Sequence, residues 1–153
     1  MLNNPREFKQ GEFTVSTDPA QLDLPWIHNY LHDEAYWSRG ITFPIFQKSV
    51  QNALCFGVYH RSKQVGFGRV ITDYATFAYL GDVFIDEGYR GQGLGKWLVE
   101  CVRGYPELQG LRRWMLVTRD AHSLYQRYGF SPLEHPERMM EIVSMANVPS
   151  SDQ

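Results

Sequence analysis

Apolar residues in the second half of the chain repeat with the period of an amphipathic helix. From Leu94 to Tyr105 they occupy positions i, i+3, i+4, i+7, i+8 and i+11, which predicts one buried stripe on a helix that stops before Pro106. A shorter helix is predicted after Asp120, which would cap its start. Gly129 would end that helix in a left-handed conformation, and its apolar face would consist of Ala121, Leu124, Tyr125 and Tyr128.

The middle of the chain is rich in β-branched and aromatic residues, as strands are. Residues 54–59 and 64–72 are separated by a polar turn, which predicts an antiparallel hairpin, and a second turn leads into a strand over 77–85. Additional short strands are expected over residues 13–15, 114–117 and 139–145.

Two helices are predicted before this hairpin. The first has Asp23 as its cap and Pro25 early, and ends near Asp33, while the second opens at Pro44 after a loop over residues 36–40. Strands followed by alternating helices and strands predict an α/β fold in which helices flank a mixed sheet.

The composition is that of one globular domain. The chain has 153 residues, 43% of them hydrophobic and 21% charged, and we expect a single domain over residues 11–146 with flexible ends at 1–10 and 147–153. The net charge of −2 gives no basic excess for a nucleic acid or an anionic membrane. No apolar run approaches the roughly 18 residues of a membrane span.

The two cysteines, Cys55 and Cys101, lie far apart in apolar surroundings and form no CxxC motif. We interpret both as buried thiols in a reducing compartment and predict a cytoplasmic protein.

Four glycines, at positions 88, 91, 93 and 95, mark the passage from the strand over 77–85 into the most regular helix. The free N–H groups at a helix start favour a phosphate or pyrophosphate, and Arg90 and Lys96 add positive charge. A flexible turn with solvated side chains is the competing interpretation. The glycine spacing matches neither a Walker loop nor a dinucleotide-binding fingerprint.

Two motifs together resemble the GCN5-related N-acetyltransferase (GNAT) family. Arg90-x-x-Gly93-x-Gly95 is similar to the family's pyrophosphate motif, and the stretch from Ala121 to Phe130 is similar to its second motif, an Ala-x-x-Leu-Tyr helix closed by Gly-Phe. The resemblance implies a V-splayed sheet and acetyl-CoA as cosubstrate. One departure is Thr118, where many members carry an asparagine that helps to fix the pantetheine arm.

The resemblance also implies where acetyl-CoA would lie. Its pantetheine would run beside Val83, Phe84 and Ile85, whose main chain would act like that of a neighbouring strand. Its pyrophosphate would lie against Arg90 and the main chain of Gly91, Gln92, Gly93, Leu94, Gly95 and Lys96.

The same resemblance implies a catalytic role for Tyr125, whereas the candidates for the general base are chosen by their position, because the family uses no fixed residue for that role. Tyr125 would protonate the departing CoA thiolate, although a buried tyrosine outside this context is more often a core residue. Asp82 is the first candidate for the general base, and a cap or a turn salt bridge is its alternative role. Glu34 is the second candidate, with a solvated side chain as the alternative.

The acceptor pocket in this architecture would be formed by residues 28–46. Its predicted members are Tyr30, Glu34, Tyr36 and Trp37. Core packing beneath a loop explains the three aromatic residues among them equally well. His28 and His32 have the i, i+4 spacing of metal ligands, but no third ligand is evident, and we expect no metal.

The sequence thus predicts an N-acetyltransferase that transfers an acetyl group from acetyl-CoA to a primary amine of a small molecule or peptide. The alternative is a non-catalytic module that binds or senses acyl-CoA on the same fold. No nucleic-acid or membrane partner is expected. A homodimer is possible because dimers are common in the family.

Overall fold

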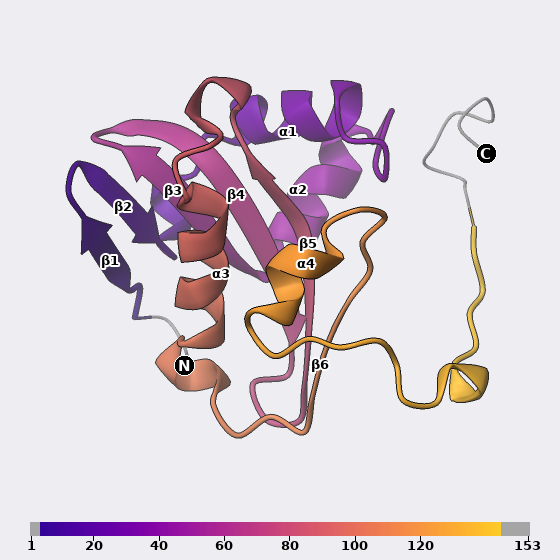
Figure 1. The fold of residues 1–153 in the computed structure, drawn as a ribbon. Coiled ribbons are helices and arrows are strands. Elements are labelled where there is room, and N and C mark those ends of the chain that lie inside the picture. The colour runs from indigo at the N-terminus through magenta and orange to yellow at the C-terminus, as the bar shows by residue number, and fades with distance from the viewer. Residues whose placement is uncertain (1–3, 145–153) are drawn as a thin grey trace.

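One six-stranded sheet organises the molecule in the computed structural model, which describes residues 4–144 (Figure 1). The strands lie side by side in chain order; β1 to β5 are antiparallel neighbours, whereas β6 pairs with β5 in parallel. The mixed sheet is therefore confirmed. The strands are β1 Glu7–Gln10, β2 Phe13–Ser16, β3 Leu54–His60, β4 Lys63–Thr72, β5 Phe77–Ile85 and β6 Arg113–Leu116.

Helices cover both faces of the sheet (Figure 1). α3 and α4 share one apolar cluster with the sheet, and α1 and α2 share a second cluster with the opposite face. The bounds are α1 Leu24–Asp33, α2 Phe43–Gln51, α3 Leu94–Arg103 and α4 His122–Gln126, with short 3-10 turns at Pro19–Gln21, Glu87–Tyr89, Pro106–Leu108 and Pro136–Arg138.

The predicted periodicity of α3 is confirmed by its burial. Of the predicted stripe, Leu98 and Val102 are fully buried against the sheet and Leu94, Cys101 and Tyr105 nearly so; Val99, which lies outside the stripe, is buried as well. Removal of each such side chain from water contributes about 1.5–3 kcal/mol, so the stripe fixes which face of α3 meets the sheet. That packing in turn fixes the position of the helix start, directly after β5.

The N-terminal boundary differs from the prediction of a flexible stretch over residues 1–10. Glu7–Gln10 forms β1, which pairs with β2 through a tight turn in which Gly11 has φ +60°. Arg6 is anchored by an ion pair with Glu107 at 2.6 Å. The strand is largely exposed, so it lacks the apolar alternation by which a strand is recognised in a sequence.

The prediction that Asp120 caps the last helix is wrong. Ala121 is the residue before α4, and its N–H is bound by the Thr118 hydroxyl at 3.0 Å. The Asp120 side chain is 72% exposed and lies 3.7 Å from Arg119. Gly129 does take the predicted left-handed conformation, with φ +95°.

The predicted strand over residues 139–145 is not formed. Residues 139–144 belong to no strand, and Met145 lies outside the described residues. Every residue from 131 to 144 is exposed, so this segment packs against little of the domain. Within the described ranges, no helix combines the length and the apolar character that crossing a membrane requires.

Candidate active site

The two parallel strands, β5 and β6, separate part-way along their length. Pairing of β5 with β6 runs from Phe77 and Arg113 to Leu80 and Leu116, and β5 then continues alone on that side to Ile85. A cavity of about 550 Å³ lies at this separation, and elements from both faces of the sheet line it. The splayed sheet implied by the GNAT resemblance is thus present, with open main chain along the end of β5.

Asp82 lies at the point where the strands part. It has φ +55°, a left-handed conformation that is uncommon for a residue other than glycine, and the pairing of β4 with β5 is irregular between Phe67 and Arg69. Such a backbone persists only where its surroundings hold it. Here the side chain provides that support.

Both carboxylate oxygens of Asp82 are engaged. Oδ1 accepts a hydrogen bond from Trp37 Nε1 at 2.8 Å, and Oδ2 accepts one from Arg69 Nε, also at 2.8 Å. The side chain is only 12% exposed and lines the cavity. Because each carboxylate oxygen can accept more than one hydrogen bond, Asp82 can accept a further hydrogen bond from a group bound in the cavity.

Tyr125 reaches the same cavity from α4. It is 9% exposed, and burial, with a smaller contribution from Tyr36, raises its pKa to about 12. The hydroxyl therefore stays protonated at neutral pH. A CoA thiol has a reference pKa near 8.5, so full proton transfer from Tyr125 to a thiolate is uphill, and the hydroxyl is best suited to donate a hydrogen bond.

Two of the four predicted acceptor-pocket residues, Tyr36 and Trp37, line the cavity. The Arg119 guanidinium lies 3.8 Å from the centre of the Tyr36 ring, and the Arg119 N–H donates to the Tyr36 hydroxyl at 3.3 Å. These contacts join the loop after α1 to the loop after β6, the two loops that border the cavity.

The other two predicted pocket residues lie elsewhere. Tyr30 stacks on Phe84 with ring centres 3.8 Å apart, and its hydroxyl accepts a hydrogen bond from Arg90. Glu34 is exposed at the end of α1 and does not line the cavity. Of the two candidate bases, the structure therefore brings only Asp82 to Tyr125.

The glycine-rich loop leads from β5 directly to the start of α3. Gly91 and Gly93 both have φ +82°, and Gly93 immediately precedes α3 without any side-chain hydrogen bond to the first turn. The first N–H groups of a helix have no intrahelical partner, so those of Leu94, Gly95 and Lys96 are available to an anion. Arg90 is oriented by a hydrogen bond to the Ile85 carbonyl at 2.9 Å.

Arg69 was missed by the sequence reasoning. It follows a run of buried residues in β4, and its side chain is only 18% exposed. The sequence feature that could have identified Arg69 is a charged residue within an otherwise nearly continuous apolar strand. A charged side chain is buried only when a partner is present.

Among residues 4–144, no group of three His, Cys, Asp or Glu side chains is arranged to hold a metal. His28 bonds to the Ile41 carbonyl at 2.8 Å, and His32 bonds to Asp33 at 2.6 Å. Cys55 and Cys101 are buried, as predicted, and burial raises the pKa of each thiol to about 12. Both thiols are therefore protonated and unreactive at neutral pH.

Comparisons with known proteins agree with this geometry. A protein of Gibberella zeae that is named as an acetyltransferase is 31% identical over 147 residues, with 81% of each chain covered. The crystal structure of a GNAT-family acetyltransferase from Xanthomonas campestris has a TM-score of 0.85 and 47% identity, covering 86% of this chain and 93% of that one.

A more distant structure, a GNAT acetyltransferase from Elizabethkingia anophelis with acetyl-CoA bound, matches in fold with a TM-score of 0.61 at 14% identity, covering 90% of this chain and 92% of that one. The family model described as "Acetyltransferase (GNAT) domain" matches residues 51–132, which include β5, the glycine-rich loop, α3 and α4. This chain therefore belongs to the GNAT family of acetyltransferases.

Proposed function

We propose that the protein transfers the acetyl group of acetyl-CoA to a primary amine, with Tyr125 and Asp82 as its catalytic residues. The observation that carries this proposal is the cavity at the separation of β5 and β6, which is lined by both side chains. Amine and thioester can meet there between a carboxylate and a protonated hydroxyl.

The residues present suit acetyl-CoA. The open edge of β5 beyond Leu80 offers main-chain groups of Val83, Phe84 and Ile85 to an extended pantetheine amide chain. The uncapped first turn of α3, with exposed Gly91, Gln92, Gly93 and Lys96, suits its pyrophosphate. The bound thioester would supply the acetyl group.

Each catalytic side chain has one task. The carboxylate of Asp82 accepts a hydrogen bond from the incoming ammonium group and takes its proton directly or through water. The amine nitrogen attacks the thioester carbonyl, and the main-chain N–H groups at the end of β5 stabilise the oxyanion. The tetrahedral intermediate then collapses with cleavage of the C–S bond, and the sulfur leaves as a thiolate to which the Tyr125 hydroxyl donates a hydrogen bond. The second proton of the amine passes through water to that thiolate or to solvent. Tyr36 and Trp37 line the part of the cavity that would hold the rest of the acceptor.

Tyr125→Phe tests the enzyme against the non-catalytic acyl-CoA sensor. Release of free CoA over a panel of amines, amino acids and peptides identifies an acceptor that turns over. With that acceptor, kcat of the variant should fall about 10²-fold, or about 2.7 kcal/mol, while acetyl-CoA affinity stays within a few fold. A variant with wild-type turnover would return Tyr125 to a packing role, and a wild type that binds acetyl-CoA but acetylates nothing would be a sensor.

The base requires a second variant with its own control. In Asp82→Asn one carboxylate oxygen becomes an NH₂ group that must face the N–H of either Trp37 or Arg69, so the change disturbs position as well as basicity. Trp37→Phe removes the indole donor and part of the ring that lines the cavity but keeps the carboxylate, so it is the control for altered position without loss of basicity. If Asp82 is the base, its variant alone should change the acidic limb of the pH–rate profile; equal profiles for both variants would refute that role.

A further inference from the structure

Exposed apolar and aromatic side chains gather around the active-site cavity. Between residues 4 and 130, five large side chains of this kind are exposed, and four of them line the cavity: Tyr36, Trp37, Ile45 and Val117. They come from the loop after α1, from α2 and from the loop after β6. The fifth, Ile71, lies on β4 and does not line the cavity. Apolar surface collected around one opening marks a place where an apolar group binds.

Less exposed side chains continue this lining. Tyr79 of β5 lies beside Gly81, where an added Cβ would come within 3.3 Å of the Tyr79 ring, so the glycine leaves room for that ring. Ile41 and Tyr125 also line the cavity. Burial raises the pKa of Tyr79 and that of Tyr125, so both hydroxyls stay uncharged at neutral pH. Sites for small molecules have this composition, in which apolar and aromatic groups surround a few polar ones.

The charges of the lining are already paired. Among the described residues that line the cavity, Arg69 is the only cation, and its guanidinium binds the Asp82 carboxylate at 2.8 Å. The other carboxylate of the lining, that of Asp120, is 72% exposed and lies 3.7 Å from Arg119. An exposed carboxylate beside an arginine attracts a further cation only weakly. The lining therefore provides no unpaired cation for a carboxylate and no acidic cluster for a second ammonium group.

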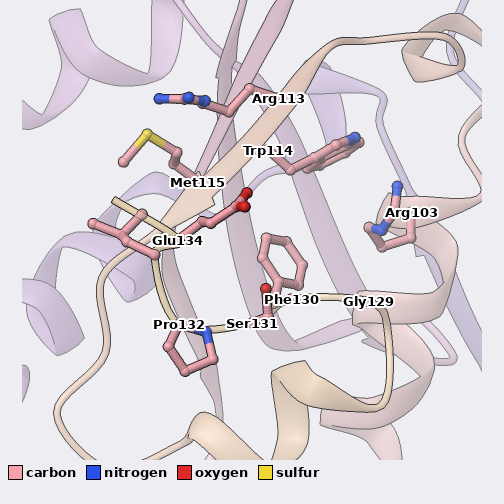
Figure 2. Close-up of a pocket in the computed structure, with 10 residues that line it drawn as sticks. Arg103, Arg113, Trp114, Met115, Gly129, Phe130, Ser131, Pro132 and Glu134 are labelled. Carbon is pink, nitrogen blue, oxygen red and sulfur yellow. The ribbon is translucent and has the colours of Figure 1, made fainter. Parts of the chain in front are cut away.

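A different hollow of the molecule, shown in Figure 2, has another character. Its volume is about 290 Å³, and three charged side chains line it beside two aromatic rings: Arg103, Arg113, Glu134, Trp114 and Phe130. Neither Asp82 nor Tyr125 lines this hollow, so its charges do not contribute to the acceptor site. The apolar lining with paired charges is thus a property of the active-site cavity and not of surface hollows in general.

This lining selects among amines by what they carry besides the reacting nitrogen. A carboxylate or a second ammonium group on the acceptor would lose water and gain no partner, which is unfavourable. An alkyl or aryl group gains by leaving water for the side chains around the cavity.

We propose that the acceptor is a small apolar monoamine, an alkyl or arylalkyl amine with one ammonium group and no carboxylate. This inference rests on the proposed function and specifies its acceptor. The ammonium group lies at Asp82, and the apolar group lies against Trp37 and Ile45. The products are the uncharged acetamide of that amine, free CoA and one proton.

A matched series of acceptors tests the selection. Hexylamine, 1,6-diaminohexane and 6-aminohexanoate share one carbon chain and one reacting amine, and they differ only in the far end. We expect kcat/KM for hexylamine to be at least tenfold higher than for either charged analogue, and phenethylamine to exceed phenylalanine in the same way.

The outcomes of this series separate the inference from the proposed function. A charged analogue that matches or exceeds hexylamine, or turnover of peptides alone, overturns the inference and leaves amine acetylation standing. Absence of CoA release with every amine and peptide overturns both.

Binding of the acetylated products tests the same selection without turnover. Calorimetry on the protein saturated with CoA should give N-hexylacetamide a dissociation constant at least tenfold lower than those of 6-acetamidohexanoate and N-(6-aminohexyl)acetamide. Equal constants for the three would overturn the inference even where hexylamine is the best substrate.

A charge placed in the lining should change the preference. Ile45→Lys adds a cation beside the cavity, so the ratio of kcat/KM for 6-aminohexanoate to that for hexylamine should rise at least tenfold. Ile71→Lys is the matched control, because Ile71 is 45% exposed and Ile45 is 40% exposed but only Ile45 lines the cavity. The control should keep the wild-type ratio. An unchanged ratio in Ile45→Lys, or an equal change in both variants, overturns the inference.

Discussion

α1 and α3 are each ten residues long and each begins with a leucine, yet their first turns are completed differently. At α1 the carboxylate of Asp23 accepts the Trp26 N–H at 3.1 Å, so the chain itself occupies part of the helix start. At α3 the corresponding position is Gly93, which has no side chain to offer. One helix start is capped by a carboxylate of the chain, and the other keeps free N–H groups that could bind an anion.

The same loop shows why glycine stands at positions 91 and 93. A side chain at Gly91 or Gly93 would meet no atom within 4 Å, so space does not require glycine at either position. The requirement is the backbone, with φ +82° at both. This conformation brings the chain into α3 with its N–H groups uncovered.

The largest effect is expected from closing α3 in the manner of α1. Gly93→Asp places a carboxylate at the helix start, where it would bind the free N–H groups and repel a pyrophosphate. Acetyl-CoA affinity measured by calorimetry should fall at least tenfold, or about 1.4 kcal/mol, relative to Gly93→Asn.

Gly93→Asn is the control because asparagine and aspartate both tolerate the left-handed conformation, so the two variants share the backbone strain. Equal acetyl-CoA affinities in the two variants would show that the pyrophosphate does not bind at this loop.

A smaller effect, on stability, is expected from removing the cap of α1. Asp23→Ala removes the acceptor of the Trp26 N–H and should lower the free energy of unfolding by about 1 kcal/mol. Denaturant titration measures this loss, and Asp23→Ser should recover most of it because serine retains an acceptor. Acetyl-CoA affinity should not change; a loss of affinity would mean that α1 also shapes the cofactor site.

The smallest effect concerns Asp73, another carboxylate of the chain that accepts hydrogen bonds from main-chain N–H groups. Asp73, in the turn between β4 and β5, binds the Thr76 hydroxyl at 2.7 Å and the N–H groups of Ala75, Thr76 and Phe77. These hydrogen bonds, those of Thr76 first, hold the pKa of Asp73 well below its ordinary value. A lowered pKa means that its contribution to stability is present above the unfolded pKa of about 3.9 and is lost as the pH falls below it.

Asp73→Asn isolates this contribution. The wild type should be the more stable protein at neutral pH, and the difference in unfolding free energy should shrink as the medium is acidified below about pH 4. Unfolding curves across that range measure it. A constant difference would show that the hydrogen-bond geometry, rather than the charge, supports the turn.

Much of the fold was predictable because burial imposes regular spacing on the sequence. The stripe from Leu94 to Tyr105, the hairpin of β3 and β4 and the Asp23 cap all follow from local rules. β1 escaped prediction because it is exposed, and the Asp120 cap was wrong because Thr118 is better placed to bind the N–H of Ala121. The local sequence pattern cannot decide which of two nearby polar side chains, Thr118 or Asp120, binds the main chain at the helix start.

The candidate site was predictable where its residues belong to a motif, and Asp82, Tyr36 and Trp37 were placed in it from their position in the chain alone. Tyr125 and the loop from Arg90 to Lys96 were found through a motif. The ion pair between Asp82 and Arg69 joins two strands. The hydrogen bond that Trp37 donates to Asp82 connects residues 45 positions apart in the chain. No spacing rule reports such contacts, which is why Tyr30 and Glu34 were placed in the pocket and Arg69 was not.

The order of the strands has a consequence for how the cavity comes into being during folding. β3, β4 and β5 are joined by tight turns and can pair early, whereas β6 reaches β5 only after residues 86–112 have crossed over the sheet. Contacts of greater sequence separation form later because more chain entropy must be lost first. Since the cavity lies between β5 and β6, it is completed with the last pairing. Variants that weaken β6 should therefore lose the site in a partly folded state that keeps the other strands paired.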